Sequence, residues 1–155
     1  MALQLKLKPN ERFVVEGVVL KNGPKRTTIE VCTRANVMRE AHAMKPEAAD
    51  TQVKKLYFVL QCMLLDSGPN ETAEQDYAQR LSDLRTVFRG NQTVLEKLDE
   101  VDTRKKYGEF FKAMRAVDPL LKYEETLLAY SKVLQNGDDP LADAADPKEV
   151  ETESS

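Results

Sequence analysis

The side chains that carry out most protein chemistry are scarce in this chain of 155 residues. His42 is the one histidine, and the two cysteines, Cys32 and Cys62, lie far apart and form no CxxC motif. A zinc site, a disulfide framework or a Cys–His nucleophile therefore lacks partners, and both thiols are expected to be buried and reduced. No glycine-rich phosphate loop, HExxH or GxSxG motif occurs. We therefore expect no enzymatic activity, no metal and no cofactor.

The residues that remain for chemistry are basic, and they gather near the N-terminus. Residues 1–56 contain 11 Lys and Arg against 6 Asp and Glu, a formal charge of +5 within a chain whose total is -3. The cations on predicted strands, loops and the first helical turn are Lys6, Lys8, Arg12, Lys21, Lys25, Arg26, Arg34, Arg39, Lys54 and Lys55. Such a group suits an anionic partner such as a nucleic acid, although lysines on a solvated sheet need no partner.

Strands are the elements that must position these cations. Leu3–Leu7 alternates apolar and polar residues strictly, which is typical of a half-buried strand. Further strands are predicted over residues 12–20, with a bulge or bend at Gly17, over 26–32 and over 36–39. The Asn22-Gly23 pair favours a tight reversal, so the second and third strands should form a hairpin with Lys25 and Arg26 at its tip. The N-terminal part therefore predicts a small antiparallel sheet of three to five strands.

Beyond Pro46 the apolar residues recur with helical spacing. Thr51 can cap a first helix that ends near residues 67–70, and a second helix should span residues 72–88. Three further short helices are predicted around residues 94–101, 107–117 and 120–134, with Tyr107 in an apolar stripe. The predicted fold class is α+β, with a small N-terminal antiparallel β-sheet followed by an α-helical bundle. The expected modules are a β-rich, RNA-binding candidate at residues 1–45 and a helical module at 46–135.

The last residues, 136–155, have a different composition. They contain Lys148 against seven Asp and Glu, a formal charge of -6, and few large apolar side chains. Such a segment cannot bury enough apolar surface to offset its ordering entropy. It is predicted to be a disordered acidic tail that either aids solubility or competes with an anionic ligand for the basic surface. No apolar run approaches the roughly 20 residues that span a bilayer, so no membrane association and a cytoplasmic location are expected.

Three stretches of the sequence resemble one protein family. They are residues 1–23, MALQLKLKPNERFVVEGVVLKNG, then residues 35–40, ANVMRE, and residues 56–58, LYF. Together they closely resemble the flagellin post-transcriptional repressor FlbT family of alphaproteobacteria, and the likeness extends through the helices over residues 1–130. The resemblance implies a regulator that associates with the 5′ untranslated region of flagellin mRNA and lowers its translation or lifetime. It also implies a functional partner, the flagellar regulator FlaF.

A weaker resemblance, to the carbon storage regulator CsrA, nominates particular residues. Residues 3–8 and 11–17 are similar to that family's first strand and turn, and residues 37–40 are similar to its valine-x-arginine-glutamate segment. In that family the first strand and this arginine form the RNA surface, which implies RNA contacts for Gln4, Lys6, Lys8 and Arg39. CsrA lacks the helical module, and its strand-swapped C-terminal part is missing here. A swapped dimer is therefore not implied, and the oligomeric state is left open as a possible homo-oligomer.

The candidate RNA-binding residues are therefore Gln4, Lys6, Lys8, Lys25, Arg26, Arg34 and Arg39. The lysines would neutralise phosphates, whereas Arg39 would offer a planar fork of donors, so Arg39→Ala should impair leader-specific binding more than Lys6→Ala. Two hypotheses are open. One is an RNA-binding repressor of flagellin mRNA, and the other is a protein-interaction adaptor or chaperone-like flagellar factor that acts on flagellin or FlaF without direct RNA contact.

Overall fold

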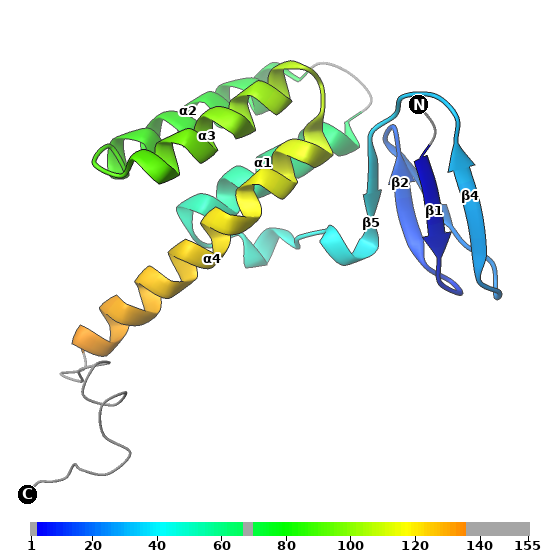
Figure 1. Cartoon of the computed structure of the whole chain (residues 1–155), viewed down its shortest axis with the longest axis horizontal. Helices are drawn as coiled ribbons and strands as arrows, with labels where there is room; N and C mark the ends of the chain where they lie inside the picture. The colour runs from blue at the N-terminus through cyan, green and yellow to red at the C-terminus, as the bar shows by residue number, and fades with distance from the viewer. Residues whose placement is uncertain (1–2, 67–69, 136–155) are drawn as a thin grey trace, which may run out of the picture. The chain divides into compact units, whose positions relative to one another are not determined.

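Figure 1 shows a computed structural model of the chain, which describes residues 3–66 and 70–135. Within these residues five strands precede four α-helices, which confirms the α+β prediction. The chain divides into two compact units, residues 1–120 and residues 121–155. The predicted acidic tail, residues 136–155, lies outside the described residues.

The strands form two antiparallel sheets. In one, β1 (Leu3–Leu7) pairs with β4 (Thr27–Val31). In the other, β2 (Arg12–Val15) lies between β3 (Val18–Lys21) and β5 (Val37–Arg39). Among strands adjacent in the sequence, only β2 and β3 pair with each other, because β4 crosses back to pair with β1 rather than with β3.

The tight reversal of the chain falls at Glu16-Gly17 rather than at Asn22-Gly23. The backbone φ angles of Glu16 and Gly17 are 49° and 80°, and two successive positive values give the two-residue turn that joins β2 to β3. The predicted hairpin between residues 12–20 and 26–32 is therefore wrong. Its first strand folds back on itself, and its second strand pairs with β1.

A small apolar core lies between the strands. Leu5 and Leu7 of β1 are buried, whereas Gln4 and Lys6 are exposed, as the strict alternation predicted. The residues of this core are Leu5, Leu7, Phe13 and Val37, with Val15, Ile29 and Val31 packed against them. Because the buried leucines fix which side of β1 faces inward, they also determine which side its polar residues present to solvent.

The helical part begins after two short 3₁₀ helices, Glu40–His42 and Pro46–Ala48. Its α-helices are α1 (Gln52–Leu65), α2 (Glu71–Val87), α3 (Gln92–Lys106) and α4 (Phe110–Gln135). The side chains of Thr51, Asn70 and Asn91 accept hydrogen bonds from the backbone N–H groups of the first turns of α1, α2 and α3. The predictions of a helix capped by Thr51 and a second over residues 72–88 are confirmed.

The prediction of three further short helices is wrong in number. Residues 107–117 and 120–134 belong mostly to one helix, α4, which continues through Pro119. A proline inside a helix removes a hydrogen bond and costs about 3 kcal/mol. Burial of Met114, Val117 and Leu120 on either side of Pro119 offsets that cost, because each large apolar side chain removed from water stabilises by about 1.5–3 kcal/mol.

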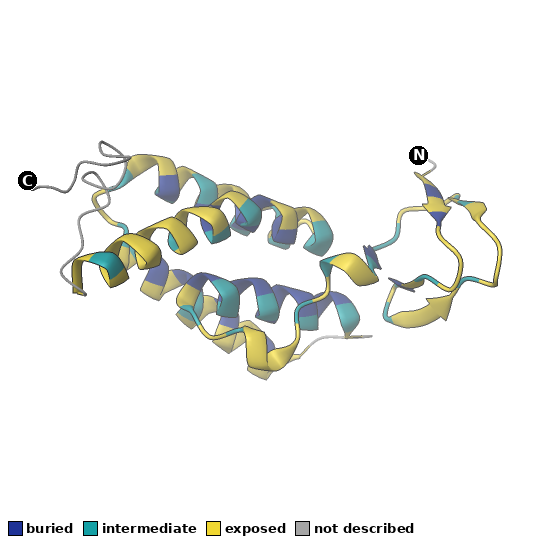
Figure 2. Cartoon of the chain, turned by 90° about the horizontal axis from the view of Figure 1, so that it is seen from below, coloured by how far each residue is buried: buried dark blue, intermediate teal, exposed yellow. Residues whose placement is uncertain are grey.

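The helices bury a larger apolar core of their own. Figure 2 shows the buried residues concentrated on the sides of the helices that face one another, and α1 packs on α2 and α2 on α3. The largest fully buried side chains are Leu56, Leu60, Leu64, Leu84, Leu98, Met114, Val53, Val101 and Val117. Within the described residues, no helix combines the length and the apolarity needed to cross a membrane.

Hydrogen bonds and a close backbone contact attach the strand region to α1. The Tyr57 hydroxyl donates to the His42 carbonyl oxygen at 2.5 Å, and the buried Gln61 amide bonds to both the N–H and the carbonyl of Met44, at 2.7 Å and 2.9 Å. A Cβ built on Gly17 would lie 2.9 Å from the Leu65 carbonyl oxygen. Glycine is therefore required at the β2–β3 turn by space as well as by its positive φ.

Two residues are exposed where burial was expected. Cys32 follows β4 directly and its side chain is exposed, whereas Cys62 in α1 is half-buried. Tyr107 does not join the apolar stripe of α4, because α3 ends just before it and it is 71% exposed. The Tyr107 ring is therefore a surface feature of the molecule.

Candidate nucleic-acid interface

The solvent face of the β1–β4 ladder carries the first of the candidate residues. The register places Gln4 opposite Glu30 and Lys6 opposite Thr28. Because side chains alternate along a strand, these four point away from the apolar core of the strands. An acid therefore shares the face with Gln4, whereas Lys6 has an uncharged neighbour across the ladder.

Four of the candidate cations gather at the end of this ladder. Lys8 follows β1 by one residue and Arg26 precedes β4 by one residue, so both lie beside the terminal pair of the ladder. The Asn22 side-chain amide donates to the carbonyl oxygens of Lys8, at 2.7 Å, and Lys25, at 3.0 Å, and holds the two loops together. We call Lys6, Lys8, Lys25 and Arg26 the basic loop end.

The side chains of the basic loop end form no ion pair among the residues that the structure describes, although the charge of Lys8 helps to lower the pKa of Glu11. All four side chains belong to exposed residues, and none forms an ion pair there, although twelve other cations in these residues do. Unpaired cations on adjoining loops can neutralise the closely spaced phosphates of a flexible strand without first losing a protein partner. The arrangement is chemically suited to a polyanion.

Arg39 lies beside the basic loop end, but its donors are engaged by the protein. Its Nε and Nη2 donate to the two carboxylate oxygens of Glu11, each at 2.8 Å, and Nη2 also donates to the Lys6 carbonyl oxygen at 2.5 Å. The hydrogen bonds from Arg39, with a further one from the Lys8 backbone N–H, lower the pKa of Glu11 to about 2.

This pairing gives Arg39 a structural role, since it links β5 to β1 and to the loop that carries Glu11. Charge-assisted bidentate pairs are among the stronger hydrogen bonds in proteins. Arg39 therefore orients the backbone at Lys6, directly beneath one of the exposed cations. Its assignment as a base-reading residue stays a prediction, and an RNA base would have to compete with Glu11 for the guanidinium.

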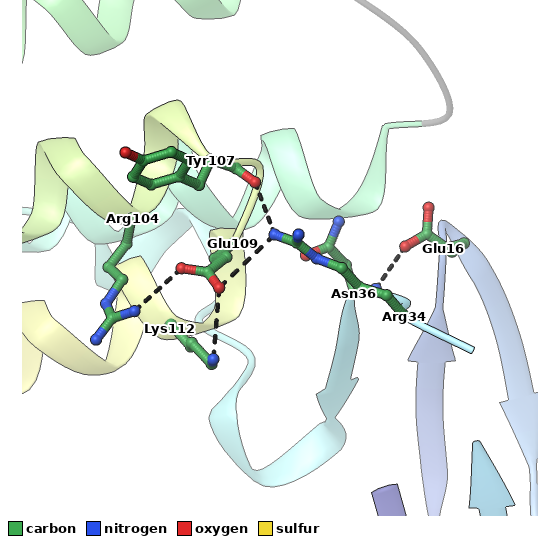
Figure 3. Close-up of polar contacts among 7 residues, drawn as sticks. All are labelled: Glu16, Arg34, Asn36, Arg104, Tyr107, Glu109 and Lys112. Atoms are coloured by element: carbon green, nitrogen blue, oxygen red, sulfur yellow. Dashed lines mark hydrogen bonds and ion pairs between the residues drawn. The ribbon is translucent and has the colours of Figure 1, made fainter. Parts of the chain in front are cut away.

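Arg34 lies at the opposite end of the ladder, beyond the Leu3–Val31 pair. The structure does not bring it to the basic loop end, since the ladder from Leu3 to Leu7 spans roughly 13 Å. Figure 3 shows where its guanidinium lies: Nη2 donates to the Tyr107 carbonyl oxygen at 2.8 Å and is 3.6 Å from the Glu109 carboxylate. Nearby, the Asn36 backbone N–H donates to the Glu16 carboxylate.

Glu109 collects three cations at the junction of α3 and α4. Besides Arg34, Arg104 Nη1 lies 3.1 Å and Lys112 Nζ 3.4 Å from its carboxylate oxygens. The hydrogen bond from Arg104, supported by the charge and hydrogen bond of Lys112, lowers the pKa of Glu109. Three cations on one carboxylate leave a net positive group. We call Arg34, Arg104, Tyr107, Glu109 and Lys112 the α3–α4 corner.

Sequence reasoning missed Tyr107 because its spacing matched the apolar stripe of the following helix. A local signal was present, since three basic residues, 104–106, precede it and Gly108 follows it. Basic residues in a last turn followed by glycine are typical of a helix end. Gly108 indeed has a positive φ of 74°, and Tyr107 is the C-cap of α3.

His42 packs against the helices. Its ring meets the Phe111 ring edge-on at 5.2 Å, and burial lowers its pKa. Across residues 3–66 and 70–135, no group of three or more His, Cys, Asp or Glu side chains is arranged to hold a metal ion.

Comparison with known proteins decides the family. The sequence profile described as "Flagellar protein FlbT" matches residues 3–128. The chain belongs to the FlbT family. The flagellum biosynthesis repressor protein FlbT of Caulobacter vibrioides is 33% identical over 140 residues, which are 89% of this chain and 99% of that protein. The probable flagellum biosynthesis repressor proteins FlbT of Caulobacter sp. strain K31 and Rhizobium etli are 32% and 27% identical, over 84% and 81% of this chain and 98% and 83% of their own lengths. No solved structure matches the chain.

The FlbT match includes both cationic groups. Residues 3–128 contain the basic loop end in the strands and the α3–α4 corner in the helices, and they leave residues 129–155 outside. The family resemblance seen in the N-terminal sequence is thereby confirmed. Both surfaces belong to the part of the chain that is characteristic of FlbT proteins.

Proposed function

We propose that this member of the FlbT family represses flagellum biosynthesis by binding the 5′ untranslated region of flagellin mRNA in the cytoplasm. Two lines support the proposal. The relatives with substantial identity are named flagellum biosynthesis repressors. The observation that carries the RNA-binding step is the basic loop end, where Lys6, Lys8, Lys25 and Arg26 lie together and are exposed, without an ion-pair partner in the described residues.

The mechanism requires only occupancy of the leader. Phosphates of an unpaired RNA segment would lie against the four cations, and Gln4 offers both a donor and an acceptor to a base edge on the same face of β1. Arg39 would contribute by holding β1 in place through the Lys6 carbonyl. A protein bound over a ribosome-binding region blocks initiation, and altered access to nucleases changes the lifetime of the message.

The test is binding of purified protein to a flagellin leader RNA, measured by fluorescence anisotropy at several salt concentrations. Four phosphate contacts to a single strand predict that log affinity falls by about 2.8 for each tenfold rise in salt. A shuffled RNA of the same length is the control and should bind more weakly. Absence of leader binding by the protein alone, or a slope near zero, would rule out direct capture of the transcript.

A second candidate function, an adaptor for flagellin or FlaF, is favoured by one observation. Exposed apolar side chains recur along the last part of α4 at helical spacing, where partner helices commonly dock. They are Tyr123, Leu127, Leu128, Tyr130 and Leu134. Leader binding that requires added FlaF would support the adaptor, whereas leader binding without it supports the repressor proposed first.

A further inference from the structure

The α3–α4 corner combines an exposed aromatic residue with a cation held against its backbone and two more on a neighbouring carboxylate. Tyr107 is 71% exposed, the largest exposed fraction among the large apolar and aromatic residues of the described chain. Its hydroxyl forms no hydrogen bond within those residues, and the ring lies outside both apolar cores. Tyrosine is enriched at recognition surfaces, because its ring is apolar and its hydroxyl is polar. The exposed ring of Tyr107 is therefore available to a partner.

The cations of the corner are fixed relative to this residue. Arg34 donates to the carbonyl oxygen of Tyr107 itself, so the guanidinium lies against the backbone that carries the ring. Glu109, only 20% exposed, holds Arg34, Arg104 and Lys112 through one carboxylate. The side chains of Arg34 and Lys112 nevertheless remain 71% and 64% exposed, which leaves them accessible to a second anion.

The combination favours a nucleic acid over a protein partner. The polar groups gathered at this corner are those of Arg34, Arg104, Glu109 and Lys112, as Figure 3 shows, and three of these four side chains are cationic. A single-stranded nucleic acid presents a flat π-surface and flanking negative charge in each nucleotide. An aromatic ring bordered by cations is complementary to both parts, because stacking and phosphate neutralisation are the two main sources of single-strand affinity.

We propose that the α3–α4 corner is a second RNA contact, in which an unpaired base stacks on Tyr107 while flanking phosphates lie against Arg34 and Lys112. This inference rests on the proposed RNA-binding function and adds a site outside the strands. The basic loop end and the corner lie at opposite ends of the β1–β4 ladder, since Arg34 follows the far end of β4. A leader long enough to reach both would bind more tightly than two separate fragments, because the second contact becomes intramolecular.

The chain contains no tryptophan, which permits a direct test of stacking. In Tyr107→Trp the single tryptophan is placed at the corner, and RNA that stacks there quenches its fluorescence. The matched control is Val87→Trp at the end of α2, an exposed residue outside the corner and outside the apolar surface of α4. Heparin, a polyanion without bases, is the second control. The expected result is quenching of the tryptophan at position 107 by single-stranded RNA, little quenching by heparin, and little quenching of the tryptophan at position 87.

Affinity measurements complete the test. Tyr107→Leu should weaken leader binding by about tenfold, as the loss of one stacked base predicts, whereas Tyr107→Phe and the control Val87→Leu should leave it within about twofold. Circular dichroism checks that each variant is folded, and the tryptophan signal still reports on stacking if Tyr107→Leu is not.

The outcomes separate this inference from the proposed function. Leader binding by the unmodified protein without RNA-dependent quenching at position 107 would overturn the second contact and leave the repressor proposal intact. No leader binding at all would overturn both. Equal quenching by heparin and RNA would show that the ring senses charge rather than a stacked base, and loss of binding to a flagellar protein in Tyr107→Leu, with RNA affinity unchanged, would assign the corner to a protein partner. Either result would overturn the stacking site.

Discussion

The two cationic regions of this protein differ in what holds their charges. At the basic loop end, the side chains of Lys6, Lys8, Lys25 and Arg26 form no ion pair among the described residues. The loops are held by hydrogen bonds of the neutral Asn22 side chain. At the α3–α4 corner, one carboxylate, Glu109, gathers three cations. Unpaired cations bind phosphate without losing a partner, whereas paired cations are positioned but partly neutralised.

This difference in ion pairing indicates how the two regions could bind different parts of one ligand. The basic loop end suits strong, sequence-independent attraction to phosphate, since its cations are exposed and form no ion pair among the described residues. The corner suits orientation, since its cations are held by the Glu109 carboxylate and, for Arg34, by the Tyr107 carbonyl oxygen. Substitutions at the two regions should therefore change different properties of RNA binding.

The largest effect is expected at the basic loop end. Replacing Lys6, Lys8, Lys25 and Arg26 together by alanine should reduce leader affinity by roughly 100-fold or more at 0.1 M salt and flatten the salt slope by about 2.8. The matched control replaces three other lysines and one arginine that are exposed and form no ion pair in the described residues: Lys45, Arg89, Lys122 and Lys132. If the control loses as much affinity as the test variant, net charge rather than this region attracts RNA.

The next experiment concerns the acid that holds Arg39. Glu11→Gln removes the charged partner of Arg39, so thermal unfolding should occur at a lower temperature at pH 7, and RNA affinity should not rise. Because the pKa of Glu11 is lowered to about 2 from 4.5, its contribution to stability is present above pH 4.5 and is lost as the pH falls towards 2. Stability curves measured across this range should fall more steeply for the unmodified protein than for Glu11→Gln.

This experiment also separates two roles of Arg39. If Arg39 reads a base, its release from Glu11 should tighten leader binding selectively over shuffled RNA. If it positions β1, the variant should lose stability without any gain in selectivity. The structure favours the second result, since the guanidinium donates to both carboxylate oxygens and to the Lys6 carbonyl.

The smallest effect is expected from Glu109→Gln. Removing the carboxylate frees Arg34, Arg104 and Lys112, so RNA should bind a few-fold more tightly, with a salt slope steeper by about 0.7 for one added phosphate contact. Glu96→Gln, on the exposed surface of α3, is the control and should leave the slope unchanged. Tighter binding to leader and shuffled RNA alike would sharpen the division, and weaker binding would show that Glu109 is needed to position the corner.

Much of the local structure could be predicted from the sequence, because its causes are local. The alternation of Leu3–Leu7 predicted which residues of β1 are buried, apart from the exposed Leu3 at its end, and Thr51 was correctly identified as a helix cap. The candidate cations were found by composition. Their distribution in space could not be predicted from composition. Four of the seven candidate residues lie together at the basic loop end only because β1 pairs with β4 and the side chain of Asn22 joins the two loops.

The errors share a physical origin in contacts between residues that are distant in sequence. The Asn22-Gly23 pair had the chemistry of a hairpin turn, but the strands on either side of it gain more by pairing with β2 and β1. Pro119 continues in a helix because buried neighbours outweigh its local cost. Arg39 had the chemistry of a reading residue, and Glu11, 28 residues away, engages it.

By itself the sequence determined the class of elements, their order, the excess of positive charge near the N-terminus and the FlbT family likeness, because periodicity, caps and composition act over a few residues. Only the tertiary structure decided which cations are paired, that Arg34 joins the helices rather than Lys6, and that Tyr107 is exposed. Those properties depend on contacts between segments that are distant in the sequence. Such tertiary contacts, rather than the residue type, decide which side chains are buried and which form ion pairs.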